Sequence, residues 1–155
     1  MATVGIDLGT TNSLVSVWQD DKCTLIPNNL GEYLTPSVVG IDENGEMLVG
    51  RTAKERLISH PENTVASFKR FMGTEKTFML GNRRFTAADL SSMVLRQLKE
   101  DAEKYLGGFP AVHAACHNVP EAADLNPAGY CSALPCLSST CFIPRTDILP
   151  LRHIS

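Results

Sequence analysis

The sequence has no apolar run approaching the roughly eighteen residues of a membrane-spanning helix. Residues 1–4 also lack the basic region and the extended apolar region of a secretory signal. Neither charge is in strong excess, since the net charge is −3 at pH 7, and this balance is too mild to favour nucleic acid or an anionic membrane surface. We therefore expect a cytoplasmic protein whose partners include neither nucleic acid nor a membrane.

Lysine is absent after residue 108, and most other charged residues are absent there too. Residues 1–108 contain all six lysines, 26 of the 31 charged residues and one of the five cysteines. Residues 109–155 contain the other four cysteines and six of the nine prolines. A chain of 155 residues is long enough for one domain with a core. The change in composition predicts that residues 1–108 belong to this domain and that residues 109–155 form a disordered, Cys- and Pro-rich tail.

This tail lacks the closely spaced cysteine pairs of most structural zinc sites. It does contain imidazole and thiolate groups that could bind zinc, at His113, His117, Cys131, Cys136 and Cys141. The two histidines are four residues apart and the three cysteines five apart, so the spacing argues against a zinc-binding module but leaves it open as an alternative.

The most informative stretch is the segment Gly-Ile-Asp-Leu-Gly-Thr-Thr-Asn-Ser at residues 5–13. The apolar, β-rich residues on its two sides predict two strands joined by a tight hairpin. Gly9 lets the backbone approach a ligand closely, and successive N–H groups in such a turn can form an anion-binding concavity. Thr10 and Thr11 add hydroxyl donors, and Asn12 tolerates the unusual backbone angles of the turn.

Asp7 narrows the kind of ligand that this turn is expected to bind. A carboxylate beside a phosphate is repulsive unless a divalent cation lies between them. The segment therefore predicts a magnesium nucleotide rather than a free phosphate as the ligand. An Asp-x-Gly-Thr sequence also occurs in turns where it supplies geometry alone, but the full nine-residue segment is much more specific.

The remaining periodicity predicts an α/β fold. Alternation and turn residues indicate further strands at residues 23–26, 37–41, 46–49, 77–80 and 83–85. Helical spacing indicates three helices, at residues 53–59 with Thr52 as N-cap, 65–72 with Gly73 as C-cap, and from Leu90 to a stop at Gly107 with Thr86 and Asp89 as a capping box.

Residues 5–13 resemble the first phosphate loop of the DnaK-type heat-shock chaperones, which belong to the actin and sugar-kinase ATPase superfamily. The resemblance covers about residues 4–106 and includes Leu-Thr-Pro-Ser-Val-Val at 34–39, His-Pro-Glu-Asn-Thr at 60–64 and Phe-Lys-Arg-Phe-Met-Gly at 68–73. Residues 26–28 and 90–92 are similar to the HscC branch of these chaperones.

The resemblance implies the first lobe of an actin-like (ribonuclease H-like) ATPase, with ATP and magnesium (Mg²⁺) as ligands. The nucleotide would be bound by backbone and hydroxyl groups of the turn, namely Gly9, Thr10, Thr11 and Asn12. Asp7 would act on the metal ion through water. On spacing alone, Lys69 and Arg70 are a solvated basic pair near a helix C-terminus, but the resemblance implies that Lys69 reaches the γ-phosphate and its attacking water as a catalytic residue.

In these chaperones ATP binding and hydrolysis control the binding of unfolded peptides, and a J-domain co-chaperone is the stimulating partner. A sugar or metabolite kinase of the same superfamily shares the Asp-x-Gly-Thr loop and stays open as an alternative. The segment Phe-Lys-Arg at 68–70 and the Asn-Thr upstream of it favour the chaperone. A non-catalytic fragment is the remaining alternative.

The resemblance ends near Gly108. The family continues with a strand that returns to the first sheet, and residues 111–120 do not match it, so we expect this strand to be missing and the lobe to be incomplete. A shifted reading frame near residues 107–116 is one explanation. The family's second phosphate loop has no counterpart here, and positioning by a complete site accounts for about 7–11 kcal/mol of a barrier. We therefore expect no measurable ATPase activity and weak ATP binding.

Overall fold

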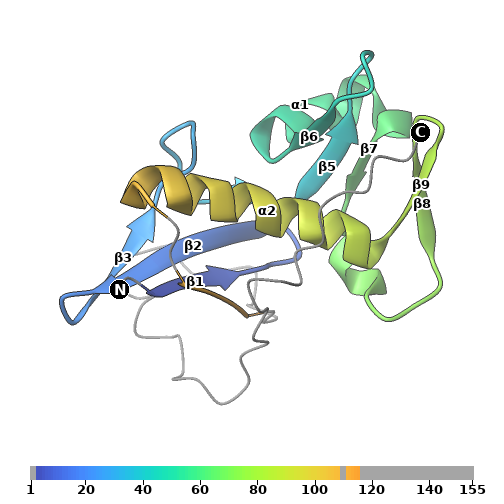
Figure 1. Ribbon diagram of the computed structural model, residues 1–155. Helices are drawn as coiled ribbons and strands as arrows, with labels where there is room; N and C mark the ends of the chain where they lie inside the picture. Colours follow the sequence, from blue (N-terminus) through green and yellow to red (C-terminus); the bar gives the residue numbers. More distant parts are fainter. Residues whose placement is uncertain (1–2, 109–110, 116–155) are drawn as a thin grey trace.

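The computed structural model describes residues 3–108 and 111–115 (Figure 1). Its elements in chain order are β1 (Thr3–Asp7), β2 (Asn12–Gln19), β3 (Lys22–Ile26), β4 (Thr35–Pro36), β5 (Val38–Ile41), β6 (Met47–Val49), α1 (Arg51–Ser59), η1 (Pro61–Asn63), β7 (Thr64–Ala66), η2 (Phe68–Phe71), β8 (Thr77–Leu80), β9 (Arg83–Thr86), α2 (Ala87–Leu106) and β10 (Ala111–Ala115), where η marks a 3₁₀ helix.

The strands form three sheets. The first has the order β10-β1-β2-β3, with β4 pairing to the start of β2, the second has the order β6-β5-β7, and the third is the β8–β9 hairpin. Only the β1–β10 pair among these ladders is parallel. This mixture of strands and helices agrees with the α/β class expected from the sequence.

The strands β1, β2 and β3 form where the sequence predicts strands, and they pair as an antiparallel meander. Asp7 pairs with Leu14 next to the turn that joins β1 to β2. At the other end of β2, Asp20 and Asp21 have φ angles of 52° and 56°, which is the left-handed pair of a two-residue hairpin turn. Asp tolerates this conformation better than most residues, so the turn is consistent with its sequence.

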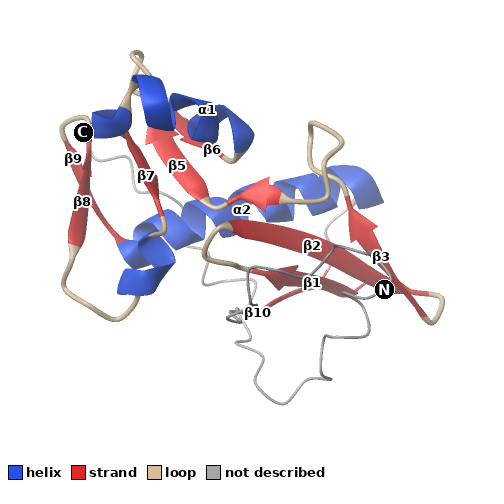
Figure 2. Cartoon of the chain, turned by 180° about the vertical axis from the view of Figure 1, so that it is seen from behind, coloured by secondary structure: helices blue, strands red, loops and turns tan. Residues whose placement is uncertain are grey.

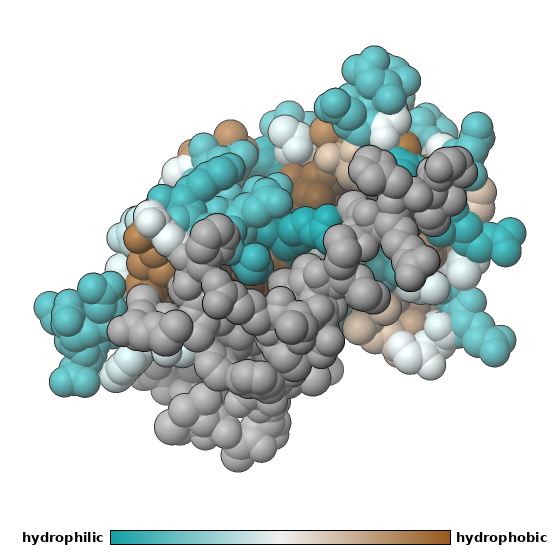
Figure 3. Space-filling model, viewed as in Figure 1, coloured by the Kyte–Doolittle hydropathy of each residue, from teal (hydrophilic) through white to brown (hydrophobic). Residues whose placement is uncertain are grey.

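Helix α2 connects the sheets (Figures 1 and 2). It packs on β1, β2 and β3 and also on β5, β9 and η2. The predicted capping box is confirmed at its start, because the Thr86 hydroxyl accepts from the Asp89 N–H at 3.2 Å and the Asp89 carboxylate accepts from the Thr86 N–H at 2.8 Å. Gly107 ends the helix in the left-handed conformation, with φ at 66°. The outward face of α2 is largely hydrophilic (Figure 3).

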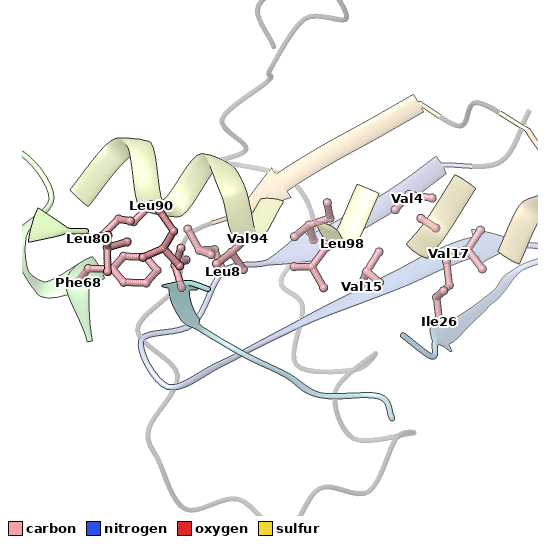
Figure 4. Packing of buried hydrophobic residues seen from close by; sticks show 14 residues of the cluster. Val4, Leu8, Val15, Val17, Ile26, Phe68, Leu80, Leu90, Val94 and Leu98 are labelled. Carbon is pink, nitrogen blue, oxygen red and sulfur yellow. The ribbon is translucent and has the colours of Figure 1, made fainter. Parts of the chain in front are cut away.

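One hydrophobic core runs along the inner face of α2. Figure 4 shows Phe68, Leu80 and Leu90 together at one end of the cluster and Val4, Val17 and Ile26 at the other, with Leu8, Val94 and Leu98 between them. Each fully buried Leu or Phe stabilises the fold by about 1.5–3 kcal/mol. Because the same helix supplies Leu90, Val94 and Leu98, the sheets share one core rather than each having its own.

The helix predicted at residues 65–72 is wrong. Thr64–Ala66 form strand β7 instead, which pairs with β5 in an antiparallel ladder. Ser67 then has a left-handed φ of 56°, and a single 3₁₀ turn, η2, follows it. The β-branched Thr64 and Val65 fit the open edge of β5 better than a helix, and this tertiary pairing outweighs the helical spacing.

The predicted N-cap of α1 is also wrong. The helix begins at Arg51 with Gly50 as its N-cap, and Gly50 has a φ of 81°. The hydroxyl of Thr52 lies inside the first turn and donates to the carbonyl oxygen of Val49 at 3.3 Å. A positive φ is easily adopted by glycine, so Gly50 supplies the abrupt entry into the helix that was assigned to a side-chain cap.

The expectation that the returning strand is missing is wrong as well. Residues 111–115 form β10, which pairs in parallel with β1 from Thr3 opposite Ala111 to Asp7 opposite Ala115. Strand β1 therefore has a neighbour on each side. The boundary expected at residue 108 stays a prediction, and β10 lies after it.

Several expectations concern residues beyond the described ranges. These are the disordered or frame-shifted nature of the tail after residue 115 and the zinc ligands His117, Cys131, Cys136 and Cys141. None of the helices within residues 3–108 and 111–115 has both the length and the apolar character that crossing a bilayer requires.

Candidate functional site

The candidate site lies at the carboxyl end of β1. This strand is central in its sheet, and Asp7, its last residue, is flanked by Leu14 of β2 and Ala115 of β10. In α/β sheets, ligands bind in the space beyond the carboxyl ends of parallel strands. The turn that follows Asp7 is thus in the place where this architecture favours a ligand.

The turn between β1 and β2 has a buried anchor and an accessible tip. Leu8 is buried in the core (Figure 4), Gly9 and Thr10 are half-buried, and Thr11 and Asn12 are exposed. Burial of Leu8 fixes the start of the turn, so the four predicted cofactor-binding residues are held together at the surface.

Gly9 has no room for a side chain. A Cβ atom at this position would lie 2.0 Å from the carbonyl oxygen of Asn12, and that oxygen belongs to the backbone of the same turn. Only glycine therefore allows the turn to close this tightly. The sequence predicted a close backbone approach here, and the approach that the structure shows is to the turn's own backbone.

Ser37, between β4 and β5, makes two hydrogen bonds to the turn. Its N–H donates to the carbonyl oxygen of Thr11 at 2.8 Å, and its hydroxyl donates to the carbonyl oxygen of Gly9 at 2.8 Å. Sequence reasoning assigned no role to Ser37, although it is the serine of the Leu-Thr-Pro-Ser-Val-Val segment. No local signal indicates this contact, because 28 residues separate Ser37 from Gly9.

Lys69 is brought to the turn by η2. Its Nζ atom donates to the carbonyl oxygen of Leu8 at 2.5 Å. The preceding residue, Phe68, is buried in the core and fixes the position of η2. Arg70 is exposed, and within the described part of the chain its side chain makes no hydrogen bond or ion pair. Lys69 is therefore hydrogen-bonded to the turn, whereas Arg70 is not.

These contacts leave two backbone donors available at the turn. All peptide bonds of the described residues are trans, so the N–H of each unit points away from its C=O. Lys69 binds the carbonyl group of Leu8, so the N–H of Gly9, in the same peptide unit, points away from Lys69. Ser37 binds the carbonyl group of Gly9, so the N–H of Thr10 points away from the Ser37 hydroxyl. Neither N–H donates to another group of residues 3–108 or 111–115.

The arrangement fits the oxygen atoms of an anion. Two adjacent N–H groups, the hydroxyl groups of Thr10 and Thr11, and the ammonium group of Lys69 are all hydrogen-bond donors. The donors lie on one turn or bind to it directly. Uncompensated N–H groups of this kind are the usual binding groups for phosphate in turns.

Asp7 provides the opposite charge at the base of the turn. The residue is 7% exposed, so it lies in a largely buried position at the end of β1. Magnesium prefers oxygen ligands and usually keeps several waters, binding through one or two carboxylates together with phosphate oxygens. The residues present therefore fit a magnesium ion held between Asp7 and a phosphate group.

A comparison with protein-family models gives one match that covers most of the chain. The family is described as Hsp70 protein, and the matched residues are 3–122. The match includes β10 and extends beyond residue 106, where the sequence resemblance was expected to end. It also spans the turn at residues 8–11, Ser37 and Lys69.

Proposed function

This chain belongs to the Hsp70 family, and we propose that the turn after β1 binds the phosphate groups of ATP or ADP together with magnesium. Hsp70 proteins in general bind these nucleotides with magnesium, and the family implies an actin-like ATPase lobe. The observation that carries the proposal is the pair of N–H groups at Gly9 and Thr10, which lie beside Asp7 and Lys69 and donate to no other described group.

The turn supplies the phosphate contacts in this proposal. The N–H groups of Gly9 and Thr10 donate to phosphate oxygens, and the hydroxyls of Thr10 and Thr11 and the amide of Asn12 add further contacts at the exposed side. Because the carbonyl groups of the turn are already bonded to Ser37 and Lys69, these donors are oriented before the ligand arrives. Such preorganisation lowers the entropic cost of binding.

Asp7 is the proposed magnesium residue. It would hold the ion through water, since one buried carboxylate cannot fill the coordination shell of magnesium. The ion, when bound, supplies positive charge that offsets the repulsion between the carboxylate and the phosphates. Asp7 would hold the water through which the ion binds, at the carboxyl end of β1.

Lys69 is the proposed catalytic lysine. An ammonium group is a compact charge that stabilises the negative charge developing on a transferred phosphoryl group. Its bond to the Leu8 carbonyl keeps the ammonium group beside the turn. Lys69 and Asp7 are thus the two charged groups that we assign to the reaction, one for the γ-phosphate side and one for the metal.

Hsp70 proteins in general also bind peptide substrates and co-chaperones. We propose that this chain is the ATP-binding portion of a cytoplasmic chaperone similar to the HscC branch, with a ribonuclease H-like first lobe. Unfolded peptides and a J-domain co-chaperone are the proposed partners. The described residues supply one side of a nucleotide site, so we expect weak ATP binding and no measurable ATP hydrolysis by the 155-residue chain.

Titration of the isotope-labelled chain with Mg·ATP, followed by nuclear magnetic resonance, tests the binding proposal. The amide signals of Gly9, Thr10 and Thr11 should shift together along a saturable curve at submillimolar to millimolar nucleotide. Mg·ADP should shift the same signals, and inorganic phosphate should do so less strongly. If these amides do not move while the chain is folded, or if the largest shifts lie on another surface, the proposed function is wrong.

A further inference from the structure

Ser37 has a buried hydroxyl group to which the proposed function assigns a hydrogen bond to the Gly9 carbonyl but no contact with the ligand. The residue is 1% exposed and lies between Pro36, the end of β4, and Val38, the start of β5. Burial of a hydroxyl is unfavourable unless it is hydrogen-bonded. Here the hydroxyl has two partners, the carbonyl oxygen of Gly9 and the hydroxyl of Ser13, each at 2.8 Å.

The direction of these two hydrogen bonds follows from counting protons. A carbonyl oxygen only accepts, so Ser37 donates its single hydroxyl proton to Gly9. Ser37 must then accept in its other bond, and Ser13 is the donor. Ser13 is also 1% exposed. The result is a directed chain of hydrogen bonds that runs from Ser13 through Ser37 to the Gly9 carbonyl.

The chain of hydrogen bonds ends on the peptide unit that carries the Thr10 N–H. The Gly9 carbonyl and the Thr10 N–H belong to one trans peptide, so fixing the oxygen inward fixes the N–H outward. Hydrogen bonds in a chain polarise one another, and a carbonyl that accepts a bond makes its peptide N–H a stronger donor. The same serine holds the other end of the turn, because its N–H donates to the Thr11 carbonyl.

We infer that Ser37 is a positioning residue for the phosphate-binding turn. It orients and polarises the Thr10 N–H through the Gly9 carbonyl, and it touches no ligand itself. This inference rests on the proposed function, because the Thr10 N–H matters only if the turn binds phosphate. It also links β4 and β5 to the ligand, although neither strand contributes a group to the phosphate contacts.

The substitution Ser37→Ala tests the inference in the full chain titrated with Mg·ADP. Loss of one hydrogen bond of ordinary net strength predicts an affinity about threefold to tenfold weaker. The shift of the Thr10 amide on binding should also become smaller. Ser37→Thr keeps the hydroxyl and should restore most of both effects. Ser91→Ala is the matched control and should leave binding unchanged. Ser91 is a buried residue of α2, and its hydroxyl donates a hydrogen bond to the sulfur of Met72.

The outcomes separate the inference from the function on which it rests. If the wild-type chain shows no Mg·ADP-dependent shift at Gly9 and Thr10, the proposed function fails. If the wild-type chain binds and Ser37→Ala binds equally well with an unchanged Thr10 response, the positioning role is wrong. A folded Ser37→Thr variant as weak as Ser37→Ala would also overturn it.

A second variant covers the case in which Ser37→Ala does not fold. Ser13→Ala removes only the donor at the start of the hydrogen-bond chain and leaves the Ser37 bond to Gly9. It should weaken Mg·ADP binding by about twofold, the lower end of the effect of a hydrogen bond. Unchanged affinity together with an unchanged Thr10 amide response in this variant would contradict the inference.

Discussion

The ammonium group of Lys69 donates a hydrogen bond to the carbonyl oxygen of Leu8, a residue 61 positions earlier in the chain. The contact joins the short 3₁₀ turn η2 to the loop at the carboxyl end of β1. Hydrogen bonds from a charged donor are roughly twice as strong as neutral ones, so this bond ties the two segments together. It also places a positive charge at the turn that we propose to bind phosphate.

Replacement of Lys69 by methionine should weaken Mg·ATP binding by about tenfold or more, which is the size expected for a lost hydrogen bond to a charged group. Titration calorimetry or the amide titration measures the change. Arg70→Met is the control, because Arg70 is the neighbouring exposed cation and should leave the affinity within about twofold. Equal effects of the two substitutions would show that Lys69 acts only through general charge.

Substitution of Gly9 by alanine should disrupt the turn, because the new Cβ would meet the Asn12 carbonyl oxygen at 2.0 Å. We expect a loss of about 1–3 kcal/mol in the free energy of unfolding and loss of detectable nucleotide binding. Gly5→Ala is the control in the preceding strand, where a Cβ would be in ordinary contact with the Ser16 hydroxyl at 3.5 Å. Thermal melts compare the two variants, and a Gly9→Ala chain that melts and binds like Gly5→Ala would refute the steric argument.

Asp7→Asn should remove the magnesium dependence of nucleotide binding. The wild-type chain should bind ATP more tightly with magnesium than with EDTA, because the ion screens the Asp7 carboxylate from the phosphates. The variant lacks this charge, so its two affinities should become nearly equal. Asp21→Asn changes an exposed carboxylate in the β2–β3 turn and should keep the wild-type ratio. A persistent magnesium effect in Asp7→Asn would argue against Asp7 as the metal residue.

Asp101 should make the stability of the chain depend on pH. This residue of α2 is 3% exposed, and the amide of Gln97 donates to one of its carboxylate oxygens at 3.2 Å. Burial raises the pKa of Asp101 above its ordinary value of 3.8, and the charge of Glu100 adds to the rise, while Gln97, Lys104 and the backbone of Asn29 oppose it. The folded state therefore retains this proton to higher pH than the unfolded state does.

This difference in proton binding sets the direction in which stability changes with pH. Between 3.8 and the higher pKa of the folded state, the folded chain binds more protons, so its stability falls as the pH rises through this window. Asp101→Asn removes the buried charge and should raise the Tm at pH 7 by up to about 3 °C, with the gain disappearing below pH 4. Glu100→Gln, an exposed position on the same helix, should give a smaller change. A lower Tm for Asp101→Asn at pH 7 would contradict this assignment.

Local chemistry explains which parts of the fold follow from the sequence. The β1–β2 hairpin depends on two β-rich runs and the short turn between them, and the start of α2 depends on Thr86 and Asp89. Gly9 to Asn12 and Asp7 could be predicted as site residues for the same reason, since a nine-residue segment contains them all. In these cases neighbouring residues determine the structure.

Long-range pairing explains what the sequence alone could not supply. Residues 65–72 have helical spacing, but β5 offers an open edge to Val65, and Ser67 turns the chain out of the strand. Strand β10 has few β-branched residues and is ordered by its pairing with β1, far away in sequence. The role of Ser37 depends in the same way on a contact with Gly9 across 28 residues.

The parallel pairing of β1 and β10 has a consequence for the order in which the protein folds during synthesis. Thr3 pairs with Ala111, so β1 is made about 100 residues before its second neighbour. Ribosomes add roughly 5–20 residues per second, which leaves this edge of β1 open for about 5–20 s. An unpaired edge of an apolar strand invites pairing with other chains. This edge of β1 is therefore open to incorrect pairing with other chains until residue 115 has been made.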